Sequence, residues 1–155
     1  MSNSRVELIE IRVAFADTDA MGIVHHANYL KYFEVARVGW LRNKGLDYRK
    51  WQDKGQHLPL VESHCRYKRP ARFEDLLTIK VKGRRDGLRV IFEYEVLNKE
   101  NGILLTTGKT EHVCVTAGTA NANTANANTA NAGAARTATD YKIMEPTSDL
   151  LDALN

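Results

Sequence analysis

The chain has 155 residues, of which 43% are hydrophobic, and its formal net charge is +3. A chain of this length can bury one sizeable core, and a charge this mild suits a small anionic ligand but does not favour a nucleic-acid partner. No segment approaches the run of about 20 apolar residues that a membrane span needs, and charges interrupt the N-terminal region where a signal peptide would be apolar. We therefore expect one cytoplasmic domain that binds neither nucleic acid nor a membrane.

The N-terminal part predicts a strand followed by a long helix. From Ile9 to Phe15 apolar residues occupy every second position, as in a strand with one buried face. The segment 29–44 contains no proline, and Asn28 and Gly45 stand at its N-cap and C-cap positions. We expect this segment to be the principal helix.

After a short helical turn at 47–52, four segments show strand periodicity: 60–67, 77–82, 90–96 and 103–115. The pairs Asp86-Gly87 and Asn101-Gly102 join the last three and suit turns with positive φ, so we expect an antiparallel meander. The small residues Ala36 and Gly39 would let this sheet approach the helix closely. The expected fold class is α+β, with about five strands and the helix on one face of the sheet.

The composition of the chain changes near its C-terminus. Residues 119–133 repeat Thr, Ala and Asn with a period of five, which fits neither a strand nor a helix, and they offer little apolar surface. We expect a domain at 1–116, a low-complexity linker or insertion at 117–139, and a tail at 140–155. In that tail, Ser148 is a candidate cap for a short helix that contains three leucines.

The two cysteines, Cys65 and Cys114, both fall in strand patterns and lack CxxC spacing. Such positions predict reduced thiols, because a reactive thiolate needs a basic and partly exposed setting. No Gly-x-Ser-x-Gly or Gly-x-Gly-x-x-Gly motif occurs either, so serine-hydrolase and dinucleotide functions lose support. We predict no metal and no cofactor.

The segment between the strand and the helix concentrates the reactive side chains. Asp19 leads into residues 22–26, whose backbone N–H groups include those left unpaired at the first turn of the helix. A carboxylate beside such donors suits acyl transfer, because one group attacks or activates water and the other stabilises the charge on a carbonyl oxygen. Hydrolysis of an ester or thioester is the resulting hypothesis. Asp17 is more typical of a turn or cap.

His25 and His26 allow several interpretations. Adjacent histidines point apart in most backbones and no third ligand has metal-site spacing, so polar contacts are favoured over metal. A neutral imidazole near a helix N-terminus can donate to a substrate carbonyl. An orienting hydrogen bond within the loop is the alternative.

Residues 15–37, together with 69–79, resemble the 4-hydroxybenzoyl-CoA thioesterase family of hot-dog-fold acyl-CoA thioesterases. The resemblance spans about residues 7–116. It implies a long central helix wrapped by a curved antiparallel sheet, and protomers that join edge to edge with active sites at the dimer interface. The family often forms tetramers of such dimers, so a homotetramer is expected.

By motif position, the resemblance implies that Asp19 is the catalytic carboxylate and that the N–H of His26 polarises the thioester carbonyl. In the bacterial short-chain acyl-CoA branch the same position is histidine, and its side chain is implicated in catalysis, so His26 is a second catalytic candidate. The N–H groups of Val24 and His25 complete the expected set of backbone donors. Whether Asp19 attacks directly or activates water is left open, because both mechanisms use the same carboxylate.

The implied substrate, an acyl-CoA, carries phosphates that basic residues must meet. The candidates are Arg89, which lies nearest a basic position of the family, and then Arg84, Arg85, Lys68, Arg69 and Arg72. A solvated hairpin is the alternative for the arginines near the Asp86-Gly87 turn. The alternatives to thioester hydrolysis are a non-catalytic acyl-CoA binding module and, less favoured, a hot-dog hydratase or dehydratase. The acyl group itself is not predictable from the sequence.

Overall fold

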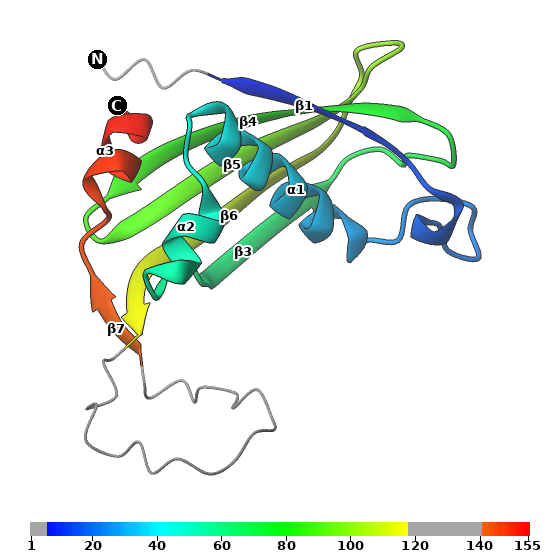
Figure 1. Cartoon of the computed structure of the whole chain (residues 1–155). Coiled ribbons are helices and arrows are strands. Elements are labelled where there is room, and N and C mark those ends of the chain that lie inside the picture. The colour runs from blue at the N-terminus through cyan, green and yellow to red at the C-terminus, as the bar shows by residue number, and fades with distance from the viewer. Residues whose placement is uncertain (1–5, 118–140) are drawn as a thin grey trace, which may run out of the picture.

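The computed structural model describes residues 6–117 and 141–155, and these form one antiparallel sheet with a long helix across one face (Figure 1). The five long strands follow the spatial order β1-β4-β5-β6-β3. Their bounds are β1 Glu7–Arg12, β3 Leu60–Tyr67, β4 Leu76–Asp86, β5 Arg89–Asn98 and β6 Leu104–Ala117. Two short strands, β2 (Gln56–His57) and β7 (Tyr141–Met144), also pair with β6.

The meander predicted from the turn dipeptides is confirmed, since β4, β5 and β6 pair in sequence and antiparallel. Gly87 and Gly102 have φ of 58° and 70°. Both values lie in the left-handed region, where glycine avoids the steric cost of a side chain.

Helix α1 (Asn28–Asn43) confirms the predicted principal helix with a shift of one residue at each end. Its cap residue is Ala27 rather than Asn28. The Asn28 side chain instead donates from Nδ2 to the carbonyl oxygen of Asp17 at 2.8 Å, so it ties the helix to the preceding loop. At the other end Gly45, with φ of 76°, lets the chain leave the helix.

The predicted close approach of helix and sheet is present and involves glycines on both sides. A Cβ on Gly39 would lie 2.6 Å from Cδ1 of Ile9, and a Cβ on Gly108 of β6 would lie 2.3 Å from the ring of Phe33. Phe33 is fully buried and stacks on Tyr94 with ring centroids 4.4 Å apart. The helix is therefore held at a distance that only glycine permits at these two points.

The predicted strand 9–15 is wrong at its end. Strand β1 stops at Arg12, Val13 is buried, and residues 15–17 form a 3₁₀ turn, η1 (Phe15–Asp17). Phe15 is 74% exposed and packs edge-on against Phe73, with centroids 5.6 Å apart. The alternation ends because the chain leaves the sheet at this point to form the loop that joins β1 to α1.

Helix α2 (Tyr48–Asp53) confirms the short helical turn, and the carboxylate of Asp47 caps it by accepting from the N–H of Arg49 at 2.9 Å. Helix α3 (Ser148–Leu154) confirms the terminal helix, but its cap residue is Thr147 rather than Ser148. Leu150 and Leu154 of α3 belong to the same buried cluster as the helix–sheet core. The repeat at 119–133, and nearly all of the proposed linker 117–139, lie outside the described residues.

Candidate active site

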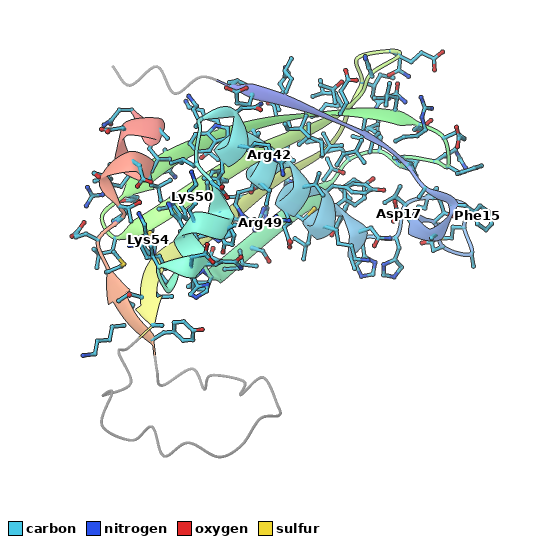
Figure 2. All side chains as sticks on the ribbon, in the orientation of Figure 1. Phe15, Asp17, Arg42, Arg49, Lys50 and Lys54 are labelled. Carbon is cyan, nitrogen blue, oxygen red and sulfur yellow. The ribbon has the colours of Figure 1, made fainter. Side chains whose placement is uncertain are left out.

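Asp17 anchors the loop that joins β1 to α1 (Figure 2). Its carboxylate accepts from the hydroxyl of Tyr32 at 2.8 Å and from the N–H of Ala14 at 3.3 Å. Its carbonyl oxygen accepts from the N–H of His25 and from the side chain of Asn28, both at 2.8 Å. Burial, and then the nearby Asp17, raise the pKa of Tyr32, so this phenol remains a donor. These four contacts give Asp17 a structural role.

Asp19 lies in the turn that follows, and only one of its carboxylate oxygens is used there. Oδ1 accepts from the N–H of Met21 at 2.8 Å, and the Asp19 N–H donates to the carbonyl of Ile23 at 2.9 Å. Gly22, with φ of 71°, makes the turn possible. Within the described residues, Oδ2 of Asp19 has no hydrogen-bond partner. The turn therefore orients the carboxylate and leaves one oxygen for a substrate or a water molecule.

The predicted set of three backbone donors is reduced by hydrogen bonds within the fold. The N–H of Val24 donates to the carbonyl of Ala71, and the N–H of His25 donates to the carbonyl of Asp17, both at 2.8 Å. Neither can reach a substrate without breaking that bond. The N–H of His26 has no partner in the part of the chain that the structure describes. The donor hypothesis is therefore corrected to this single N–H, whose catalytic role stays a prediction.

His26 is surrounded by aromatic rings. Its imidazole centroid lies 4.1 Å from that of His25 and 6.4 Å from the ring of Tyr67. The Tyr67 hydroxyl donates to the His26 carbonyl at 3.1 Å. Partial burial, followed by the neighbouring Cys65, raises the pKa of Tyr67 to about 12 and keeps this donor protonated. No motif in the sequence marks Tyr67 as a residue of this site.

A groove of about 400 Å³ brings these residues together. It joins the carboxylate of Asp19 and the imidazole of His26 to apolar and aromatic walls, with two basic residues beside them. Its other lining residues are Met21, Ile23, Val24, Tyr29, Tyr67, Lys68, Arg69 and Pro70. Such a groove can hold an apolar acyl group next to a base and a hydrogen-bond donor, which is the arrangement that acyl transfer requires.

The comparisons with known proteins agree with this chemistry. The family model described as the Thioesterase-like superfamily matches residues 13–154. The chain belongs to this superfamily. It is 36% identical to a putative esterase of Aquifex aeolicus over 69% of this chain and 83% of that protein. It is 33% identical to the putative acyl-CoA thioesterase YneP of Bacillus subtilis over 68% of this chain and 77% of that protein.

The fold also matches that of a solved thioesterase structure. A 1,4-dihydroxy-2-naphthoyl-CoA thioesterase from Synechocystis superimposes with a TM-score of 0.69 at 28% identity, covering 72% of this chain and 83% of that one. The resemblance inferred from the two motifs, the hot-dog fold and the prediction of a thioester hydrolase are therefore confirmed. Because a relative and a structural neighbour carry thioesterase names, the groove at Asp19 is the candidate active site of such a hydrolase.

The predicted phosphate-binding residues divide into two groups within this thioesterase chain. Lys68 and Arg69 line the groove, and Arg72 follows nearby in a turn where its N–H donates to Oδ2 of Asp75 at 2.8 Å. These three residues lie at the same end of the sheet as Asp19.

Arg84, Arg85 and Arg89 lie at the other end, around the β4–β5 turn next to α3 (Figure 1). Strand β4 is 11 residues long and separates them from the β1–α1 loop by roughly 30 Å. They pair with carboxylates there: Arg84 with Glu93 at 3.3 Å, Arg85 with Glu145, and Arg89 with Glu111. Within one chain, these arginines therefore lie far from the groove at Asp19. The order of residues in the sequence does not reveal this separation.

No group of three or more His, Cys, Asp or Glu side chains among the described residues is arranged to hold a metal ion. Among the same residues, no helix is long and apolar enough to cross a bilayer. Cys65 and Cys114 are both free, as expected for reduced thiols, and burial raises the pKa of both.

Proposed function

We propose that the protein hydrolyses the thioester bond of an acyl-CoA and releases a free carboxylic acid and CoA. The observation that carries this proposal is the arrangement at Asp19. One carboxylate oxygen is fixed by the Met21 N–H, the other has no partner among the described residues, and the groove that Asp19 lines also contains His26. The Bacillus subtilis relative carries the name putative acyl-CoA thioesterase, which supports the same substrate class.

In the reaction that we propose, Asp19 supplies the attack on the thioester carbonyl. As a general base it takes a proton from water while the water oxygen bonds to the carbonyl carbon. As a nucleophile it forms a mixed anhydride that water then hydrolyses. In both cases the His26 N–H donates to the developing oxyanion, the C–S bond breaks, and CoA leaves as a thiolate that takes up a proton. The imidazole of His26 is a further donor toward the thioester.

The catalytic assignment is tested with Asp19→Asn, which is nearly isosteric. Because the amide is neither a base nor a nucleophile, we expect kcat to fall by about 10² to 10⁴, with an unchanged circular dichroism spectrum. Turnover is followed by the release of free thiol from a panel of acyl-CoAs. Asp17→Asn is the matched control, since Asp17 bonds to Tyr32 and Ala14 rather than facing the groove. We expect it to lower stability more than kcat.

Near-normal turnover by Asp19→Asn would remove the carboxylate from the mechanism. If the native protein releases no thiol from short, long or aromatic acyl-CoAs, the acyl-CoA binding module becomes the better explanation. Single turnover in ¹⁸O-labelled water separates the two roles of Asp19. Label in the Asp19 side chain favours the anhydride, and its absence counts against it.

The quaternary structure that we propose follows from the exposed edge of the sheet. Strand β3 pairs only with β6 in the described part of the chain, and Leu60, Val61 and Tyr67 on it are each 50% exposed. An exposed strand edge of eight residues offers a row of unpaired backbone groups to a second copy. We propose that two copies pair along β3 with a two-fold axis between them.

When a two-fold axis pairs β3 with β3 of a second copy, the two strands run antiparallel. The Tyr67 end of one β3 therefore meets the Leu60 end of the other. The β4–β5 turn lies toward the Leu60 end, because Arg89 is 3.8 Å from Glu62. The dimer would therefore bring Arg84, Arg85 and Arg89 toward the groove of the partner copy, beside its Lys68, Arg69 and Arg72. Binding of the CoA phosphates in trans, a tetramer of such dimers and a cytoplasmic location complete the proposal.

A further inference from the structure

A second groove, of about 620 Å³, lies where α1 ends and α2 begins. Its lining residues are Val38, Arg42, Gly45, Leu46, Asp47, Tyr48, Arg49 and Lys50. It is at the opposite end of α1 from the catalytic loop, and this helix of 16 residues is about 24 Å long. The site described above uses none of these residues.

The groove carries an excess of positive charge. Figure 2 shows the side chains of Arg42, Arg49, Lys50 and Lys54 gathered over the end of α1 and over α2. All four are exposed, and none forms an ion pair with a carboxylate in residues 6–117 and 141–155. Among the described residues that line the groove, Asp47 is the one acid, and its carboxylate caps the N–H of Arg49. These cations are therefore available to an anionic ligand.

Helix stability explains only part of this cluster. Arg42 lies in the last turn of α1, and Lys50 in the last turn of α2, where cations favourably oppose the negative end of the helix dipole. Arg49 lies in the first turn of α2, where a cation faces the positive end of the dipole and is unfavourable. The helix dipoles therefore account for Arg42 and Lys50 but not for Arg49.

The shape of the groove indicates what it can hold. Gly45 leaves one wall without a side chain, and Leu46 is buried beneath it. Tyr48 and Val38 are half-buried and contribute an aromatic ring and an apolar surface next to the guanidinium groups. Guanidinium groups bind phosphate oxygens in pairs, and an aromatic ring can stack on a planar base. A volume of this size is typical of small-molecule sites.

We propose that this groove binds the nucleotide part of a phosphorylated ligand, with the phosphates at Arg42, Arg49 and Lys50 and the base against Tyr48. This chemistry has two sources, a free nucleotide and the nucleotide half of an acyl-CoA bound in the partner copy. The second source rests on the proposed function, and it would place the phosphates of that ligand in this groove instead of at Arg84, Arg85 and Arg89. Helix α2 directly precedes β2 and β3, so in the proposed dimer it lies at the end of β3 that meets the catalytic end of the partner.

Binding is measured on the full chain by calorimetric titration with ADP, with CoA, and with adenosine as the ligand without phosphate. The variant is the double substitution Arg42→Gln with Arg49→Gln, and both side chains are exposed. The matched control is Lys31→Gln with Lys82→Gln, which removes the same charge from exposed positions outside the groove. We expect ADP or CoA to bind the control within twofold of the native protein and the variant at least tenfold more weakly, and adenosine to bind weakly to all three.

Turnover then assigns the source. If the groove holds the nucleotide of the substrate, KM for an acyl-CoA rises at least fivefold in the variant, while kcat and KM for the matching acyl-pantetheine do not change. If it holds a free nucleotide, both KM values stay constant and only ADP binding is lost. The proposal is overturned if the native protein binds neither ADP nor CoA, or if the variant binds them as well as the control does. The titration needs no turnover, so an inactive enzyme would refute the proposed function without affecting this test.

Discussion

Gly108→Ala tests how closely α1 must lie against the sheet. The new Cβ would lie 2.3 Å from Cε2 and Cζ of Phe33, whereas carbon atoms in contact are about 3.5–4.0 Å apart. The Phe33 ring has to move by more than about 1 Å. It cannot do so freely, because it is fully buried and stacks on Tyr94, the residue of β5 that pairs with Gly108. The substitution therefore pushes α1 away from β6.

Overpacking of this kind costs about 1–3 kcal/mol. Alanine is preferred over glycine in a strand by roughly 0.5–1 kcal/mol, and Gly108 does not have a positive φ, so this gain offsets part of the cost. We expect the free energy of unfolding to fall by about 1–2 kcal/mol, and the midpoint of thermal unfolding by about 2–8 °C. Urea and thermal unfolding, followed by circular dichroism, measure both quantities.

The double variant Gly108→Ala with Phe33→Leu provides the control, because leucine vacates the space that the new methyl group enters. We expect the double variant to be more stable than the sum of the two single effects, by at least about 1 kcal/mol. A Gly108→Ala protein that unfolds at the native temperature, or strictly additive effects, would refute the close packing of Phe33 on β6.

Three further predictions concern single side chains. Tyr67→Phe removes the hydroxyl that donates to the His26 carbonyl and so positions His26. In steady-state assays of thiol release we expect kcat to fall about tenfold, with little change in KM. An unchanged kcat contradicts this positioning role of Tyr67. Burial lowers the pKa of His112 from 6.5 to about 4, so the unfolded chain takes up a proton that the folded protein does not. Stability should therefore fall by up to about 3 kcal/mol from pH 6.5 to 4, and urea titrations should show a shallower fall in His112→Gln. Burial also raises the pKa of the Cys114 thiol to about 11, so Cys114 should react with thiol reagents at pH 8 only after unfolding; rapid labelling of the folded protein would contradict its burial.

The elements that the sequence predicted well are those specified locally. Strand β3 has the predicted bounds, and α1 is shifted by one residue, because periodicity and end signals act over a few residues. The turns at Gly87 and Gly102 were predictable for the same reason, since each dipeptide favours its own backbone conformation. A contiguous motif singled out Asp19 and His26, which line one groove, and their catalytic roles stay predictions.

The remaining features depend on contacts between distant segments. The N–H of Val24 is occupied by Ala71, which lies 47 positions further along the chain, so the sequence counted a donor that the fold uses elsewhere. The distance from Arg89 to the catalytic loop depends on the direction in which β4 runs. The position of Tyr67 beside His26 depends on how β3 meets α1. None of these relations is encoded in a spacing that can be read along the chain.

Strand β6 has neighbours along both of its edges, with β5 and then β7 on one side and β3 and then β2 on the other. Its backbone amides can exchange hydrogen with solvent only when the sheet itself opens, whereas β1 and β3 each pair with one strand in the described part of the chain. The catalytic loop follows β1, an edge strand at the low end of this gradient of protection. The loop after β1 is tied to the fold by the contacts of Asp17 and Val24, so its amides should exchange before those of β6.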